Sequence, residues 1–340
     1  ASLPTALVVV GTALAAMPAS LFSRRVGRKA GFLCGTVLAA ASGAACTASI
    51  YLESFWLLAL GGLLFGFFAG FAQLYRFAVA DVASEAFRPR AISLVLAGGV
   101  FAGLAGPLLA DWGEHLISSQ QFMGGFLFMI AVALLAALTL MFLSIPNLTK
   151  KQLEGPQRSL LEIMKQPVFI AAAVSATIAQ TVMNFLMTAT PIAMIHICGH
   201  SFGSMTSVIG WHTVAMFAPG FFTGNLIKKF GEIKMITAGL ILEGACIAIA
   251  LAGIEVMNFW LAMFLLGVGW NFTFTAATSL MTTAYTPAER GKTQGMMNQI
   301  IYTVVAIGSL SSGAFIHFFG WNWVNVAAIP LLAIAAAVTF

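Results

Sequence analysis

Long apolar runs follow one another along almost the whole chain, and they decide what it can fold into. A helix needs about 20 mostly apolar residues to cross a bilayer. The ten-residue alternation typical of a transmembrane β-barrel is not seen. The sequence therefore predicts an all-α, polytopic membrane protein. We read eleven apolar runs, at residues 3–22, 30–50, 55–80, 91–110, 123–145, 167–197, 204–227, 235–254, 258–284, 294–318 and 321–340.

The composition excludes most soluble classes of protein. Apolar residues make up 60% of the 340 residues and charged residues only 8%, against about 45–50% and about 25% in a soluble globular domain. A soluble enzyme or a nucleic-acid-binding protein could not cover its surface with so few charges. The four cysteines lie in or beside apolar runs and form no CxxC pair, and the histidines share no ligand spacing, so we expect no metal site and no cofactor.

Basic residues occur in alternate loops. Fifteen of the sixteen Lys and Arg residues fall between runs one and two, three and four, and so on, whereas the other loops carry only acidic charges. Lys and Arg accumulate in cytoplasmic loops of membrane proteins. We therefore expect these loops to lie in the cytoplasm, and the protein to be a multi-pass protein of the plasma (inner) membrane.

Two loop segments recur at nearly equal spacing, which indicates an internal repeat. Gly27 and Gly231 are 204 residues apart and each follows a basic pair, while Arg88-Pro-Arg90 and Arg290-Gly-Lys292 are 202 apart. Duplicated halves are common in transporters. We therefore predict two helical bundles, at residues 1–145 and 167–340, joined by a charged cytoplasmic linker at 146–166. The first bundle has five spans and the second six, so we expect one further helix before residue 1, giving twelve in the parent.

The loop after the first run contains a motif by which the chain resembles a known family. Twelve spans in two six-helix halves, with G-x-x-x-D-R-x-G-R-K after the second span, are typical of the major facilitator superfamily. Arg25-Val-Gly27-Arg28-Lys29 matches the core of this motif, although Ser20 and Arg24 replace its Gly and Asp. Asp81 and Arg88 match the spacing of the acidic residue and the Arg after the family's fourth span. The chain thus resembles this family over its whole length, which implies secondary transport by alternating access around a central cavity.

The same resemblance implies a conformational latch formed by the loop residues. Asp81 is expected to pair with a basic residue of the first loop, or alternatively to carry a proton. Glu243, which lies inside a span with no basic residue near it in sequence, is a second coupling candidate or else a neutral structural acid. The expected latch comprises Arg24, Arg25, Gly27, Arg28, Asp81, Arg88, Lys228, Gly231 and Arg290.

Candidates for the solute cavity come from polar residues inside the runs and from aromatic residues that could stack on a flat organic ring. Arg76 is the only basic residue outside the basic loops; it either reaches the inner interface or pairs with Asp81, or it faces the cavity as an anion-binding or gating residue. Polar side chains recur every three or four residues in three runs, and they either line the cavity or join helices by hydrogen bonds. The cavity candidates are Arg76, Gln180, Asn184, Trp270, Asn271, Thr275, Asn298 and Tyr302.

The function that we predict is transport of a small organic solute by a monomer, coupled to an ion gradient and most simply to protons. No P-loop is present to use a nucleotide. Two alternatives stay open: a transporter-like sensor or scaffold without flux, and a membrane-embedded enzyme.

Overall fold

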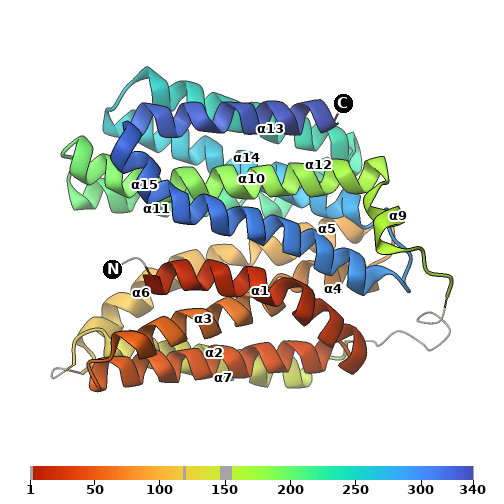
Figure 1. The fold of residues 1–340 in the computed structure, drawn as a ribbon, viewed down its shortest axis with the longest axis horizontal. Helices are drawn as coiled ribbons and strands as arrows, with labels where there is room; N and C mark the ends of the chain where they lie inside the picture. The colour runs from red at the N-terminus through yellow and green to blue at the C-terminus, as the bar shows by residue number, and fades with distance from the viewer. Residues whose placement is uncertain (1–2, 118–119, 146–154, 340) are drawn as a thin grey trace. The chain divides into compact units, whose positions relative to one another are not determined.

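The computed structural model describes residues 3–117, 120–145 and 155–339. These residues form helices joined by short connections, with no β-strand among them, which confirms the predicted all-α fold (Figure 1). The helices are α1 (Leu3–Val26), α2 (Arg28–Tyr51), α3 (Phe55–Ala72), α4 (Tyr75–Val82), α5 (Arg88–Ala97), α6 (Gly99–His115), α7 (Met123–Phe142), α9 (Leu160–Met164), α10 (Pro167–Ile192), a π-helical turn (Ala193–Ile197), α11 (Phe202–Phe217), α12 (Gly220–Phe230), α13 (Glu232–Ala252), α14 (Val256–Met281) and α15 (Arg290–Thr339).

Nine segments of the described chain are long and apolar enough to cross a membrane. The 50-residue α15 is one of them, but its backbone is non-helical at Gly320, where φ is 77°, so it contains two spans. The run at 204–227 is divided into α11 and α12 at Pro219, and neither piece alone has the length of a span. These two breaks account for the difference between nine segments and eleven apolar runs.

The helices extend past the ends of several apolar runs. α1 continues to Val26 and includes Arg24 and Arg25 in its last turn, although the apolar run ends at residue 22. Helical hydrogen bonds continue into polar residues, whereas hydropathy marks only the part suited to lipid. Inside the runs, short breaks at Gln73–Leu74 and at Gly98 divide α3 from α4 and α5 from α6.

One compact unit comprises Ala1–Ala78, Leu104–Leu160 and Thr286–Ala306. Within it α3 packs against α1 and α2, and α7 packs against α2, as Figure 1 shows. Glycines allow the backbones of α1 and α3 to approach closely, because a Cβ built on Gly11 would lie only 2.6 Å from the carbonyl oxygen of Leu63. The first part of α15 completes this unit.

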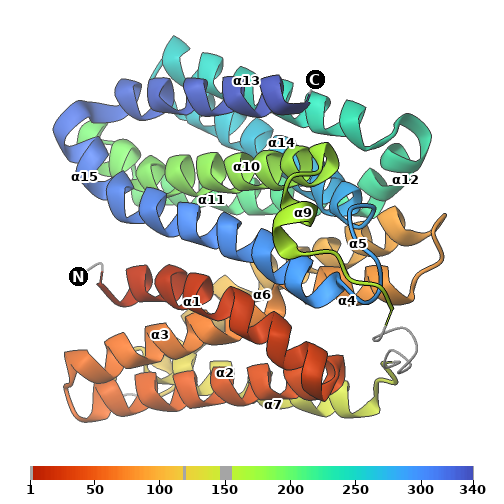
Figure 2. The ribbon, with the colours of Figure 1, turned by 45° about the vertical axis from the view of Figure 1, so that its right-hand side comes forward.

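The other compact unit comprises Val79–Gly103, Leu161–Tyr285 and Ile307–Phe340. α14 is its central helix and contacts α5, α10, α11, α12 and α13; Figure 2 shows α14 and α10 inside this group. Each compact unit therefore includes segments from both halves of the sequence. The division into bundles at 1–145 and 167–340 stays a prediction, and residues 146–154 of the linker lie outside the described residues.

The repeated glycines have the same backbone conformation. Gly27, between α1 and α2, has φ 94° and ψ 155°, and Gly231, between α12 and α13, has φ 85° and ψ 162°. Residues with a side chain rarely adopt these angles. The two equivalent helix junctions are therefore built alike, as the repeat predicts.

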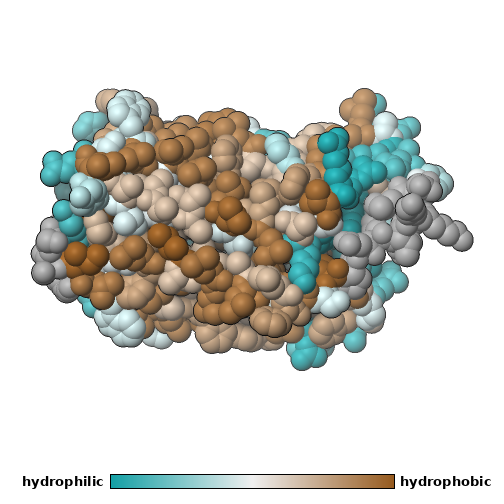
Figure 3. Space-filling view, turned by 90° about the horizontal axis from the view of Figure 1, so that it is seen from below, coloured by the Kyte–Doolittle hydropathy of each residue, from teal (hydrophilic) through white to brown (hydrophobic). Residues whose placement is uncertain are grey.

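Apolar side chains cover much of the surface. In the face drawn in Figure 3, hydrophobic residues occupy the broad middle and hydrophilic residues gather toward the two ends. This is the distribution expected where the middle of the helices contacts lipid and their ends contact water.

Candidate functional site

Arg76 lies at the start of α4, directly after the break that ends α3. Its side chain is only 2% exposed. One guanidinium nitrogen, Nη1, donates to Oε1 of Gln73 at 2.7 Å, and the other, Nη2, donates to Oδ1 of Asn298 at 2.6 Å. The guanidinium carbon lies 4.9 Å from the centre of the Phe77 ring. Arg76 is therefore an internal residue of its unit and does not extend to an exposed position.

Asn298 and Tyr302 are one turn apart on α15 and face Arg76 together. Tyr302 interacts electrostatically with the guanidinium group, and its side chain is 7% exposed. Nδ2 of Asn298 is buried and has no hydrogen-bond partner among the described residues. Three of the predicted cavity residues are thus in one cluster, the Arg76 cluster, which contains Arg76, Gln73, Asn298 and Tyr302.

A second cluster lies in the other compact unit, between α10 and α14. Nε1 of Trp270 donates to Oε1 of Gln180 at 2.8 Å, and both side chains are less than 10% exposed. Asn184 lies one turn farther along α10, where its Nδ2 donates to the backbone oxygen of Gln180 at 3.2 Å. This arrangement brings together three of the predicted cavity residues, Gln180, Asn184 and Trp270.

Aromatic rings surround Trp270. Phe274, one turn along α14, stacks on it with ring centres 5.1 Å apart and an angle of 17°. Phe217 of α11 meets it edge to face at 5.7 Å. We call Gln180, Asn184, Phe217, Trp270 and Phe274 the Trp270 cluster. It combines flat aromatic surface with amide groups, a combination suited to a planar ring with a polar edge.

Asn271 joins helices of its own unit. Its Oδ1 accepts a hydrogen bond of 2.7 Å from Thr223, and its Nδ2 donates to the backbone oxygen of Met216 at 2.7 Å. These bonds connect α14 to α12 and α11, so both polar ends of the amide are used within the protein. Thr275 is fully buried, and its hydroxyl has no partner among the described residues.

The motif at the junction of α1 and α2 packs against the start of α15. Oγ of Ser20, at the position where the family motif has Gly, donates to the backbone oxygen of Gly291 at 2.7 Å. Arg28 is buried and donates to the side-chain oxygen of Gln294. Arg24 donates to Oε1 of Gln157 at 3.3 Å. The serine therefore supplies a bond that the usual glycine could not.

An ion pair that the sequence did not indicate lies next to this contact. Arg158 holds the buried Glu289 through Nε at 2.9 Å and Nη2 at 2.6 Å, and its backbone N–H adds a third bond at 2.7 Å. These hydrogen bonds from Arg158 lower the pKa of Glu289 to about 2, assisted by the backbone N–H of Thr286. Opposite charges in two loops were the only sequence signal, and they are 131 residues apart.

The other predicted latch residues lie at helix ends. Arg25 and Lys228 are exposed, and Arg290 is half-buried. Asp81 is half-exposed, while Nε of Arg88 donates to the backbone oxygen of Ala80 at 3.2 Å. The pairing of Asp81 with a basic residue of the first loop stays a prediction.

Glu243 lies near the middle of α13 and is fully buried. Neither carboxyl oxygen has a hydrogen-bond partner among the described residues. Buried polar groups without partners are rare in proteins. Among the same residues, no three His, Cys, Asp or Glu side chains are close enough together to hold a metal ion.

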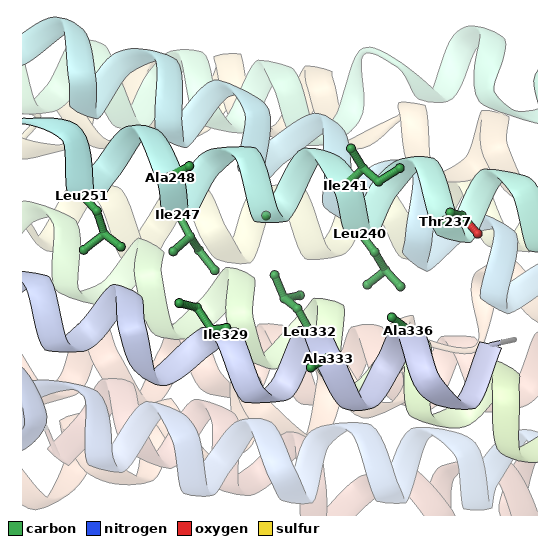
Figure 4. Close-up of a pocket in the computed structure, with 11 residues that line it drawn as sticks. Thr237, Leu240, Ile241, Ile247, Ala248, Leu251, Ile329, Leu332, Ala333 and Ala336 are labelled. Carbon is green, nitrogen blue, oxygen red and sulfur yellow. The ribbon is translucent and has the colours of Figure 1, made fainter.

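An apolar groove runs between α13 and the last part of α15, and Figure 4 shows its lining side chains. Leu240, Ile247 and Leu332 point into it, and Thr237 is the one residue with a polar side chain in the lining. This lining offers no group that could orient a polar solute, so the two polar clusters are the better candidates for a binding site.

A family model and the relatives of this chain indicate the same family. The family model described as Major Facilitator Superfamily matches residues 1–192 and 172–340. The riboflavin transporter RfnT of Brucella anthropi is 40% identical over 336 residues, covering 98% of this chain and 84% of that protein. The MFS-type transporter YddS of Bacillus subtilis is 30% identical, covering 100% of this chain and 82% of its own length.

Solved structures show the same fold at low identity. The human organic anion transporter MFSD10 (TETRAN) has a TM-score of 0.77 at 17% identity, covering 100% of this chain and 83% of that one. The transporter FucP in the outward conformation has a TM-score of 0.76 at 16% identity, covering 100% and 89%. With its multi-pass helical fold, its matched family model and its relatives, the chain belongs to the major facilitator superfamily and is an MFS-type transporter.

Proposed function

We propose that this protein is a secondary active transporter that moves riboflavin, or a solute with a similar flat heteroaromatic ring, by alternating access. The observation that carries the proposal is the 40% identity to a riboflavin transporter over 98% of the chain. In the proposed arrangement the protein is a monomer in the plasma membrane, its basic loops face the cytoplasm, and a proton gradient drives transport.

The Trp270 cluster supports a flat ring as the solute. Riboflavin carries a planar three-ring system whose edge has carbonyl and N–H groups, and a chain of hydroxyls. Trp270, Phe217 and Phe274 supply aromatic faces, and Gln180 and Asn184 supply amides beside them. Stacking on an aromatic side chain contributes about 1–3 kcal/mol per ring in nucleic-acid complexes, enough to select a planar solute.

The Arg76 cluster supports a polar, oxygen-bearing part of the solute. The guanidinium group of Arg76 and Nδ2 of Asn298 are hydrogen-bond donors, and the guanidinium group donates to the neutral side-chain oxygens of Gln73 and Asn298. Donors of this kind bind carbonyl or hydroxyl oxygens without requiring an ionised solute. Arg76 is thus proposed as a binding residue for an uncharged polar group.

The experiment is uptake of radiolabelled riboflavin by a riboflavin auxotroph and by proteoliposomes that contain the purified protein. Trp270→Leu is expected to lower kcat/KM for riboflavin transport by about tenfold, which corresponds to about 1.4 kcal/mol. Trp323→Leu is the matched control, because Trp323 lies in the same unit but is 59% exposed. It is expected to transport at the rate of the unmodified protein.

Different outcomes separate the alternatives. Transport of riboflavin that competes with unlabelled lumichrome, which has the ring but no hydroxyl chain, would support recognition of the ring. Equal loss in both Trp variants would contradict a role for the Trp270 cluster. Absence of riboflavin flux in either direction, with the protein present in the membrane, would refute the proposed solute and favour a sensor without flux.

A further inference from the structure

The contact between α13 and α14 encloses the acidic side chain of Glu243, which the packing of these two helices does not require. Glu243 is the twelfth of the 21 residues of α13, about 17 Å along the helix from Glu232. That depth is close to the middle of a hydrocarbon layer of about 30 Å. An ionisable residue at this depth is costly and is by default a functional candidate.

Two glycines bring α13 and α14 together beside Glu243. A Cβ built on Gly239 would lie 2.6 Å from the backbone oxygen of Gly269, and one built on Gly269 would lie 2.9 Å from Cγ of Glu243. Thr273, one turn beyond Gly269, is also buried, and its hydroxyl has no partner among the described residues. The carboxyl group is therefore sealed inside the crossing of the two helices, without a hydrogen bond to compensate for an ionised form.

Within the described part of the chain, no charged group faces Glu243 from the elements around it. Cys246, one turn along α13, is the titratable neighbour that interacts with it. α10, α14 and residues 320–339 of α15 contain no Asp, Glu, Lys, Arg or His, and the lysines of α12 are at the end that adjoins Gly231. The acid form of Glu243 fits this surrounding, and the anion requires water that only a separation of the helices could supply.

The internal repeat shows that an acid is not needed for this packing. α2 begins at Arg28 and α13 at Glu232, 204 residues apart, so the counterpart of Glu243 in the first half is Ala39. Ala39 is buried at 4% exposure in α2, which packs against α3 as α13 packs against α14. A small apolar residue therefore suffices at the equivalent position.

α14 connects Glu243 to the Trp270 cluster. Three consecutive residues of this helix face three neighbours: Gly269 lies against Glu243, Trp270 bonds Gln180 of α10, and Asn271 bonds Thr223 of α12. If α14 moves away from α13 as one body, its contacts with α10 and α12 move with it. The Glu243 contact and the Trp270 cluster therefore lie on the same helix, one residue apart.

We propose that Glu243 is the proton-binding residue that couples the proton gradient to solute movement. The carboxyl group holds a proton while α13 and α14 are closed, as in this structure. It releases that proton to water when the two helices separate, and it takes up another from the opposite side in the next cycle. This inference rests on the proposed function, and it adds the residue at which coupling occurs.

The first test compares two transport modes in proteoliposomes with riboflavin as the probe. An imposed difference of about one pH unit sustains up to about a tenfold solute gradient at one proton per solute. Glu243→Gln is expected to abolish this accumulation while solute exchange at equal pH continues. Glu232→Gln is the matched control, because Glu232 begins the same helix and accepts a hydrogen bond from Ser279. Accumulation that persists in Glu243→Gln would overturn the proposal.

A second test does not depend on the solute. The infrared spectrum of the unmodified protein is expected to contain the carbonyl band of a protonated carboxylic acid. Glu243→Gln should remove that band, so the difference between the two spectra should show it. Its presence without riboflavin exchange would refute the proposed solute and leave the proton site standing. In the unmodified protein, riboflavin exchange without pH-driven accumulation, or without the band, would refute the proton site alone. Glu243→Ala, which introduces the residue found at the equivalent position 39, is expected to fold and to show the same loss of coupling.

Discussion

Trp270 and Gln180 are 90 residues apart in sequence, and a 2.8 Å hydrogen bond between their side chains links α14 to α10. The bond fixes the orientation of an indole ring that also packs against Phe217 and Phe274. The ring is therefore held by a directional contact as well as by packing, which makes it a pre-organised surface for stacking.

Replacing Gln180 with Leu is expected to leave the buried indole N–H without an acceptor. The cost is about 1–3 kcal/mol, the penalty of an unpaired buried donor, and the purified protein should melt at a lower temperature. Gln299→Leu is the control, because the Gln299 side chain bonds Thr303 in an exposed position. Equal melting temperatures for both variants would show that the Trp270 bond adds no stability.

Arg76 and Asn298 are expected to be energetically coupled. Arg76→Gln and Asn298→Ala each break the 2.6 Å bond between them, so the double variant should lose less stability than the sum of the single variants. The expected coupling is about 0.5–3 kcal/mol, measured by thermal or denaturant unfolding in detergent. Arg76→Lys should not retain this coupling to Asn298, because an ammonium group lacks the planar fork that reaches Gln73 and Asn298 together. Additive losses would contradict the cluster, and the exposed Arg25→Gln serves as the control.

The bond between Arg158 and Glu289 is expected to make stability depend on pH. The pKa of Glu289 is lowered from its usual 4.5 to about 2 by the bonds from Arg158, so its stabilising effect is complete above about pH 4.5. It is lost as the pH falls toward 2, where the folded protein also binds the proton. Glu289→Gln should therefore destabilise the protein at pH 7, and the difference should shrink progressively below pH 4.5.

Unfolding of both proteins from pH 7 down to pH 3 measures this dependence. Arg158→Gln should shift the curve in the same way, since it removes the same bonds. A stability difference that stays constant with pH would contradict the assigned role of the carboxylate.

Gly224 is expected to tolerate no side chain. Its Cβ would lie 2.5 Å from Cα of Arg90 and 2.8 Å from the backbone oxygen of Pro89, and backbone atoms cannot move aside as a side chain could. Gly224→Ala should therefore disrupt the packing of α12 on α5 and lower stability by about 1–3 kcal/mol. Gly210→Ala in α11 is the control, because its Cβ would meet nothing within 4 Å. It should leave stability unchanged or raise it by about 0.5–1 kcal/mol.

The sequence predicted the helices and the repeat because both depend on local patterns. Apolar runs mark the spans, and the glycines after basic pairs mark two junctions of equal conformation at Gly27 and Gly231. Gln180 also came from a local stripe of polar residues, and Trp270 was chosen as an aromatic residue inside a run. Their partners could not be predicted, because a hydrogen bond between distant helices depends on how those helices are rotated.

Arg76 and Glu289 show what local patterns leave open. The hydrogen bond from Arg76 to Asn298 joins residues 222 apart in sequence, and no periodicity specifies a contact over that separation. The pairing of Glu289 with Arg158 could not be predicted, because Arg158 lies in a loop whose position no periodicity specifies. Asn298 lies in α15, and Glu289 lies in the loop before it, so both contacts involve this part of the chain.

The unit that contains Arg76 is completed by residues Thr286–Ala306, and this has a consequence during biosynthesis. At about 5–20 residues per second, a ribosome that has added Ala78 needs roughly 10–40 s to reach residue 286. During that interval Arg28 and Arg76 are already made, while Gln294 and Asn298, which receive their hydrogen bonds, are not. A nascent chain halted before residue 286 thus lacks the two acceptors that Gln294 and Asn298 later provide to Arg28 and Arg76.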